Sequence, residues 1–295
     1  MKATANKAII YDDTCPLCVW YTSAFVKTGM LEKHNRISFN ELTNKSDIAA
    51  NMDIHRSKHE IPLVDLKGGE TLYGLDSLEF ILSQKMPFIA WLLQFRLIRA
   101  FFKTFYNIVS YNRRVIVGAA KTQTQTQTQT HSYDCTPDFH VGYRLIYIFL
   151  AVLVSILGVY WFANGMAEAF AVPSLAYFNF ATLMIAVIAW GIYFCMAFLS
   201  IPNNRTRIEY FGQLATTMLM GLGIYIVSMG IVAWIPNEVI AIGGATFAIV
   251  ASFGVMCQAH FRRLKVVNLA NWRMIAWILS FLVAALVVLS SLLSI

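Results

Sequence analysis

Hydrophobic and polar positions follow different patterns in the two halves of the chain. In the first half, the short apolar runs at residues 8–11 and 37–42 have the length of β-strands, and residues 19–30 show helical periodicity. Residues 60–66 and 70–74 form two more strand-like runs, separated by a Gly-Gly turn signal. This order of strands and helices predicts an α/β domain.

The second half is dominated by long apolar stretches. Each of five stretches is long enough to cross a membrane as a helix, which takes about 20 residues. They cover residues 143–166, 175–199, 210–235, 238–261 and 272–294. We therefore predict an all-α transmembrane helix bundle of about five spans over residues 143–295.

Basic residues are unevenly distributed among the loops of this predicted bundle. The loops after the first and third spans hold only Glu168 and Glu238. The loops after the second and fourth spans hold six basic residues, namely Arg205, Arg207, Arg262, Arg263, Lys265 and Arg273. Because cytoplasmic loops carry an excess of Lys and Arg, we expect an integral membrane protein with a cytoplasmic N-terminal domain and an external C-terminus.

Two segments join the halves. Residues 86–120 are rich in aromatic side chains, and Arg96, Arg99 and Lys103 within them share one helical face. This pattern favours amphipathic interfacial helices, although a helix packed against the soluble domain would look similar. Residues 121–142 begin with a Gln-Thr repeat that cannot build a core, and we interpret them as a low-complexity linker and membrane-entry segment.

Composition supports this division. Apolar residues make up 58% of the chain, against about 45–50% in soluble domains. The net charge is +7, but no basic stripe interleaves with stacking aromatics. We therefore expect an anionic membrane surface, rather than nucleic acid, as the partner of the basic side chains. The polar N-terminus leads directly into the first strand, and we expect no signal peptide there.

The main chemical signal is the Cys-Pro-Leu-Cys sequence between the first strand and the following helix. Cys15 would lie at a helix N-terminus, where a thiolate is stabilised, and Pro16 fits the first helical position. We predict that Cys15 is an exposed nucleophile and that Cys18, one turn later and more sheltered, is the resolving thiol. Two alternatives remain open. The pair is half of a zinc site, although no paired Cys or His accompanies it, or the domain is redox-silent.

Asp12, Cys15 and Cys18 give the pattern Asp-x-x-Cys-x-x-Cys. With Tyr106 and Asn112-Arg113 later in the chain, roughly residues 7 to 115 resemble the DCC family of predicted thiol-disulfide oxidoreductases. This resemblance implies a thioredoxin-like fold for the redox domain, which we place at residues 1–85. An acidic Asp12 next to a thiol would raise its pKa, so we expect Asp12 to influence proton transfer.

The resemblance also implies a role for Ile61-Pro62. In the thioredoxin fold an Ile-Pro pair with a cis peptide bond packs beside the cysteines, and we expect Pro62 to leave its neighbouring backbone free to orient an extended substrate. The alternative is an ordinary trans proline at the start of an edge strand.

Three further cysteines lie in the second half. The predicted topology places Cys135, Cys195 and Cys257 near the cytoplasmic face, together with His260. They are candidates for a relay of thiols, or a metal site, that exchanges with Cys15. The alternative is that they are small hydrophobic residues of apolar helices. We expect no cofactor and no resident metal.

These observations predict a membrane-anchored thiol–disulfide oxidoreductase, acting on a thiol or disulfide protein or on a small molecule. The alternative is a membrane binding or transport module whose thioredoxin-like domain serves for docking or redox sensing, or is redox-silent.

Overall fold

The computed structural model of the 295-residue chain describes most of the sequence. The described residues are 4, 6–42, 45–118, 136–169, 184, 188, 191–232, 234–235 and 238–293. The chain divides into two compact units, Met1–Arg144 and Leu145–Ile295. The predicted linker at 121–130 lies outside the described residues.

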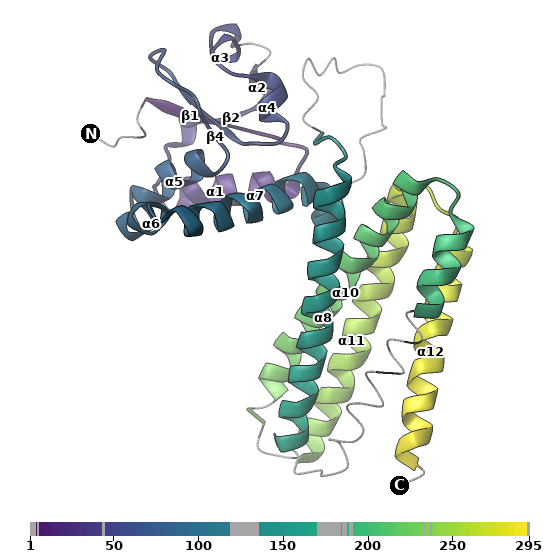
Figure 1. Cartoon of the computed structure of the whole chain (residues 1–295). Helices are drawn as coiled ribbons and strands as arrows, with labels where there is room; N and C mark the ends of the chain where they lie inside the picture. The colour runs from purple at the N-terminus through teal and green to yellow at the C-terminus, as the bar shows by residue number, and fades with distance from the viewer. Residues whose placement is uncertain are drawn as a thin grey trace. The chain divides into compact units, whose positions relative to one another are not determined.

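A four-stranded mixed sheet forms the centre of the first unit (Figure 1). Its strands are β1 (Lys7–Tyr11), β2 (Arg36–Ser38), β3 (Pro62–Asp65) and β4 (Leu72–Tyr73). The strand order is β2-β1-β3-β4, with β1 parallel to β2 and antiparallel to β3, and β3 antiparallel to β4. This mixed α/β sheet fits the predicted thioredoxin-like fold.

Helices cover both faces of the sheet. The elements between the strands are α1 (Pro16–Lys27), the 3₁₀ helix η1 (Lys33–Asn35), α2 (Phe39–Leu42), α3 (Ser46–Ala50) and α4 (Ile54–Ser57). After β4 follow α5 (Leu75–Ser83), α6 (Pro87–Leu93) and α7 (Arg96–Val117).

Alternation along β1 separates two hydrophobic cores. Ala8 and Ile10 point to a core that is shared with α2 and α3, whereas Ile9 points to the opposite core. That second core contains Phe25 of α1 and Ile81 of α5. Because successive side chains of a strand face opposite sides, the apolar run of β1 supports helices on both faces.

The second predicted strand is shorter than expected. It ends at Ser38, and residues 39–42 form α2 instead. The reason is a capping box: the Ser38 hydroxyl accepts a hydrogen bond from the Glu41 N–H, and the Glu41 carboxylate accepts one from the Ser38 N–H. This Ser-x-x-Glu pattern starts a helix where the alternation alone predicted a strand.

Helix α7 runs the length of the first unit's helical face, as Figure 1 shows. It ends at Gly118, whose φ of 63° is left-handed, as is common at helix C-termini. The three basic residues predicted to share a face are not equivalent. Arg99 binds Asp76 at 2.5 Å and Glu79 at 3.0 Å, so this part of the predicted interfacial face packs against α5.

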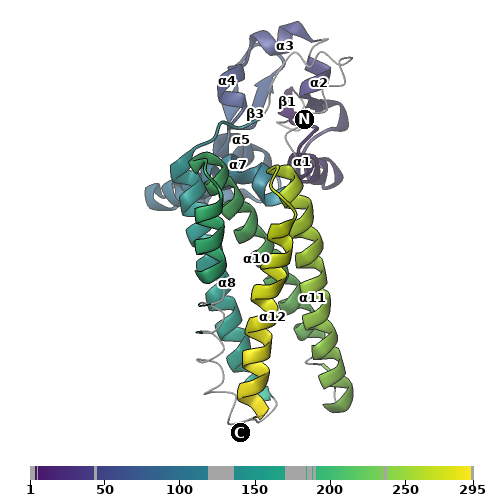
Figure 2. The ribbon, with the colours of Figure 1, turned by 90° about the vertical axis from the view of Figure 1, so that its right-hand side faces the viewer.

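The second unit consists of long helices. They are α8 (Val141–Ala169), α10 (Asn204–Val232), α11 (Glu238–Val266) and α12 (Trp272–Leu293). Figure 2 shows these helices side by side. A hydrogen bond of 2.6 Å between the hydroxyls of Tyr147 and Thr216 joins α8 to α10.

Among the described residues, two helices are long and apolar enough to cross a membrane. They are Val141–Gly158 and Asn204–Val232. Gly191–Ser200 and Trp272–Leu282 are shorter apolar helices. Much of the predicted span at 175–199 lies outside the described residues, and the count of five spans remains a prediction.

Candidate active site

The junction of β1 and α1 places the two cysteines as the sequence predicts. Cys15 is the N-cap residue of α1 and has extended backbone angles, and Pro16 begins the helix. The Cys15 N–H donates to the Asp12 carbonyl at 3.3 Å, which turns the chain from the strand into the helix. Cys18 follows within the first turn, and both cysteines are free thiols.

The two thiols differ strongly in acidity. A hydrogen bond from Cys18 lowers the pKa of Cys15 from its ordinary value of 9.0 to about 6, although burial opposes this shift. The same hydrogen bond, together with burial, raises the pKa of Cys18. Cys15 is therefore the thiol that ionises near neutral pH, as expected for a nucleophile.

Charges on both sides act on Cys15. The positive charge of Arg113 lowers the pKa of Cys15, and the smaller effect of the Asp12 carboxylate raises it. The predicted sign of the Asp12 effect is thus the one found. The dominant contribution, however, comes from Cys18.

The predicted exposure of Cys15 is wrong. Its exposed fraction is 0%, and that of Cys18 is 4%. The reason is that the C-terminal part of α7 lies across the start of α1. There, Arg113 and Arg114 approach Asp12 at 3.6 Å and 3.7 Å.

Asp12 is held from two sides. One carboxylate oxygen accepts hydrogen bonds from the Thr14 N–H at 3.0 Å and from the Thr14 hydroxyl at 2.6 Å. The other oxygen faces Arg113 and Arg114, and the Arg114 guanidinium also donates to the Thr14 hydroxyl at 3.4 Å. This partly buried network fixes the loop that carries Cys15.

The expected cis bond before Pro62 is also wrong. The described part of the chain contains no cis peptide bond, so Ile61–Pro62 is trans. Nor is the neighbouring backbone free. The Ile61 N–H donates to the Tyr106 hydroxyl at 2.9 Å, and the Ile61 carbonyl accepts from the Gly74 N–H and the Ser77 hydroxyl. Pro62 starts strand β3 with a trans bond, as in the alternative, but β3 is an inner strand of the sheet and not the edge strand that the alternative assumed.

Reasoning from the sequence assigned no chemical role to the residues of α7 that complete the site. Tyr106 secures Ile61, whereas Arg113 and Arg114 approach Asp12. In the sequence, the family resemblance is the signal that links Tyr106 and Arg113 to the cysteines. Burial raises the pKa of Tyr106 to about 12, so its hydroxyl stays protonated at neutral pH.

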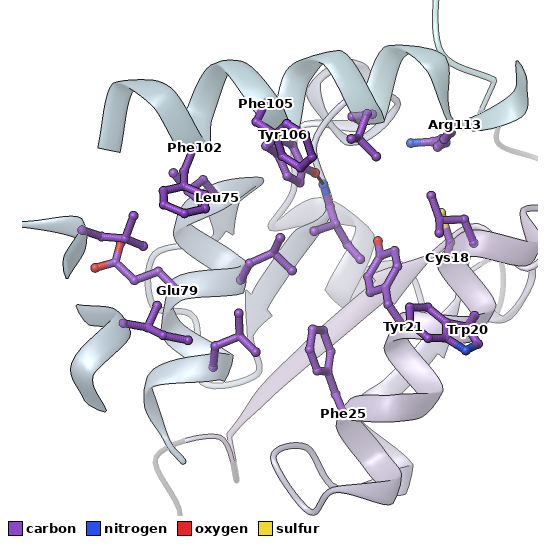
Figure 3. Close-up of a pocket in the computed structure, with 18 of the residues that line it drawn as sticks. Cys18, Trp20, Tyr21, Phe25, Leu75, Glu79, Phe102, Phe105, Tyr106 and Arg113 are labelled. Atoms are coloured by element: carbon purple, nitrogen blue, oxygen red, sulfur yellow. Dashed lines mark hydrogen bonds between the residues drawn. The ribbon is translucent and has the colours of Figure 1, made fainter. Parts of the chain in front are cut away.

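A pocket of about 560 Å³ adjoins the cysteines within the first unit (Figure 3). Its wall is almost entirely apolar and comes from α1, α5, α6, α7 and Ile61. Cys18 and Arg113 line the same end of the pocket, whereas Glu79 lies at the other end. Cys15 is absent from the lining, so Cys18 is the thiol that meets the pocket.

The three cysteines proposed as a relay belong to other parts of the chain. Cys135 lies outside the described residues. Cys195 is exposed and Cys257 is partly buried, both in the second unit. His260 is buried and stacks on Trp277 with ring centroids 4.9 Å apart, which is a packing role. Nowhere in the described ranges do three His, Cys, Asp or Glu side chains gather in a way that could hold a metal ion.

Comparisons with known proteins bear on the first unit. No curated protein and no solved structure matches the chain. A family model does match, and it covers the sheet, the two cysteines and the whole of α7. The N-terminal part of the chain, residues 9–119, thus matches the DCC1-like thiol-disulfide oxidoreductase family.

Proposed function

We propose that the protein is a membrane-anchored thiol–disulfide oxidoreductase that acts through Cys15 and Cys18. The observation that carries the proposal is the position of Cys15 at the start of α1, hydrogen-bonded by Cys18, with a pKa of about 6. A thiol with this pKa is mostly ionised at pH 7, and the thiolate is the form that attacks disulfides.

The reaction has two displacement steps. The Cys15 thiolate attacks a substrate disulfide, which gives a mixed disulfide and releases one substrate thiolate. Cys18 then attacks the Cys15 sulfur, so that a Cys15–Cys18 disulfide forms and the second substrate thiol leaves. Once Cys15 is in a mixed disulfide, it no longer presents a thiolate to Cys18. The main influence that raises the pKa of Cys18 is then gone, and this favours the second step.

Residues of α7 and the β1–α1 loop would position these thiols. Arg113 stabilises the Cys15 thiolate, and Asp12 anchors Arg113 and Arg114 beside it. Pro62 would support the site as the first residue of β3, next to the secured Ile61 backbone, and would not present free backbone to a substrate.

Membrane anchoring rests on the apolar helices α8 and α10 and on the distribution of basic loop residues. We propose that the redox domain faces the cytoplasm and that the C-terminus lies outside. A reporter enzyme that is active only outside the cytoplasm should be active when fused after Ile295 and silent when inserted at residues 202–207. The reverse pattern would overturn the orientation.

The burial of both thiols favours a second candidate function. A protein disulfide cannot reach a thiol with no exposed surface unless α7 moves away. In that case the domain would be a docking or sensing module for a membrane binding or transport protein. The two candidates differ in whether the thiol pair cycles between dithiol and disulfide.

The test uses the full chain with Cys135, Cys195 and Cys257 replaced by Ser, so that only the pair remains. With bis(2-hydroxyethyl) disulfide, we expect Cys18→Ser to accumulate a mixed disulfide at Cys15, detected by mass spectrometry. Cys15→Ser is the matched control and should accumulate far less. If both variants react equally slowly and the intact pair never forms a disulfide, the second candidate function is correct.

A further inference from the structure

The apolar pocket next to Cys18 is larger than a packing defect. Its volume of about 560 Å³ falls in the range of small-molecule sites, roughly 300–1,000 Å³. Its walls come from four helices and Ile61, so the first unit forms it without help from the second. An apolar molecule of drug size would fill it.

The pocket reaches the surface through aromatic side chains. Trp20, Phe88 and Phe105 belong to its lining, and their exposed fractions are 71%, 60% and 53%. Trp20 lies at the Cys18 end, so an apolar tail would leave the pocket at the other end, past Phe102. Exposed aromatic clusters of this kind mark apolar ligand or membrane contacts.

The Cys18 end of the pocket combines a thiol with a hydrogen-bond donor. Figure 3 shows Cys18 on α1 and Arg113 on α7 at this end, with the Tyr21 hydroxyl pointing toward them. Arg113 already faces the Asp12 carboxylate at 3.6 Å. Because Asp12 and the Cys15 thiolate supply negative charge there, a neutral carbonyl oxygen fits this end better than a carboxylate or phosphate head group.

The burial of the two thiols also favours a small molecule over a folded protein as the substrate. Cys15 and Cys18 are closed to bulk solvent, but Cys18 forms part of the pocket wall. A pocket ligand therefore meets the dithiol directly, whereas a folded protein substrate does not. Oxidation of a dithiol to a disulfide releases two electrons and two protons, so a ligand that oxidises the pair must accept both.

We propose that this pocket binds a lipid-soluble quinone, with its ring at Cys18 and Arg113 and its apolar tail toward Phe102 at the Glu79 end. The proposal rests on the proposed function and names the electron acceptor of the same dithiol. It gives the buried pair a two-electron oxidant that is small enough to enter the pocket.

The quinone oxidises the dithiol through a transient bond between Cys18 and the ring. The Cys18 thiol, which donates a hydrogen bond to Cys15, passes its proton to the Cys15 thiolate as the Cys18 sulfur bonds to the quinone ring. Cys15 then loses this proton and attacks the Cys18 sulfur. The Cys15–Cys18 bond forms as the bond from Cys18 to the ring breaks, and its electron pair stays on the ring. The proton of the Cys18 thiol and one proton taken from water end on the two ring oxygens, so that the pair with its one thiolate and a quinone become a disulfide and a hydroquinone. Arg113 stabilises the ring oxygen on which negative charge develops.

The experiment uses the full chain, with only Cys15 and Cys18 retained, in phosphatidylcholine vesicles. The reduced protein is mixed, in the absence of oxygen, with a fully substituted benzoquinone bearing a ten-carbon tail. Because every ring position is substituted, addition of a thiol does not give a stable aryl thioether. We expect loss of quinone absorbance in step with disulfide formation, one quinone per dithiol, with a rate that saturates with quinone concentration.

Two tryptophan substitutions on α7 locate the site. Val109→Trp fills the pocket and should slow quinone reduction by roughly tenfold or more. Leu97→Trp, at a residue of the same helix that is 85% exposed and outside the pocket lining, should leave the rate unchanged. Oxidation by bis(2-hydroxyethyl) disulfide should proceed at the wild-type rate in Leu97→Trp, and an unchanged circular dichroism spectrum should report that Val109→Trp is folded.

The outcomes separate the two proposals. Normal oxidation by the small disulfide with no quinone reduction overturns the quinone site but leaves the oxidoreductase function standing. No oxidation by either reagent overturns both. Equal quinone rates in Val109→Trp and Leu97→Trp would mean that the reaction does not occur in the pocket. If a redox-inert saturated fatty acid abolishes quinone reduction at low concentration while no quinone saturation is seen, the pocket is an acyl-chain site instead.

Discussion

The Tyr106 hydroxyl lies 2.9 Å from the backbone nitrogen of Ile61 and accepts its hydrogen bond. The two residues are 45 positions apart, and this bond ties α7 to the start of β3. Ile61 is 7% exposed, so no water can easily replace the hydroxyl. Helix α7 thus packs as part of the first unit.

This relationship predicts the effect of Tyr106→Phe. The substitution leaves a buried N–H without an acceptor, which should destabilise the domain by about 1–3 kcal/mol. We expect Cys15 and Cys18 to become reactive toward a maleimide at a lower temperature than in the wild type. Tyr111→Phe on the same helix is the matched control, because it keeps the ring that stacks on His59. Equal shifts for the two variants would contradict the importance of the Tyr106 bond.

The charges around Cys15 predict opposite shifts in its titration. Cys15 is alkylated as the thiolate, so its rate should rise with pH through about 6 and then level. Arg113→Gln removes a positive charge and should raise the pKa of Cys15. Asp12→Asn removes a negative charge and should lower it. The measurement is the rate of iodoacetamide alkylation of Cys15 against pH.

The direction of these pKa shifts distinguishes an electrostatic effect on Cys15 from a change in the fold. Both substitutions break the same buried ion pair, and a purely structural effect would move both profiles in the same direction. Shifts of equal sign would therefore show that Asp12 and Arg113 act on Cys15 only through folding. Opposite signs are expected from their charges.

Local features of the site could be predicted from the sequence because they depend on neighbouring residues. Pro16 at the first helical position and Cys15 as the N-cap follow from the Cys-Pro-Leu-Cys spacing. The hairpin of β3 and β4 follows from its Gly-Gly turn. Strand β1 follows from the apolar run at residues 8–11, whose Ala8, Ile9 and Ile10 are all buried.

Contacts between distant residues could not be predicted in this way. Arg114 and Thr14 are 100 positions apart, and nothing in either local pattern shows that α7 returns to the start of α1. The burial of Cys15 depends on this return, as does the pocket at Cys18. The aromatic residues of α6 and α7 indicated an apolar surface, but their periodicity did not show that this surface encloses a cavity.

Arg99 and Arg96 offer a test of how α7 packs on α5. Arg99 forms ion pairs with Asp76 and Glu79, and its side chain is 42% exposed. Because exposed ion pairs are worth little, Arg99→Met should destabilise the domain by only about 0.2–1 kcal/mol, and less at high salt. Arg96→Met, at an exposed position of the same helix, should have no measurable effect on thermal unfolding. An Arg96 effect as large as that of Arg99 would instead point to a shared basic surface.

Two glycines of α10 provide a matched pair for the second unit. A Cβ at Gly221 would lie 2.6 Å from Cγ of Met256 on α11, whereas a Cβ at Gly223 would meet nothing within 4 Å. Gly221→Ala should therefore push α10 and α11 apart or displace Met256, which costs about 1–3 kcal/mol, as overpacking usually does. Gly223→Ala adds only helix propensity and should be neutral or slightly stabilising. The melting temperature of the full chain in detergent, followed by circular dichroism, should fall for the first variant only. If both variants melt like the wild type, the close approach of the two helices at Gly221 is not a determinant of stability.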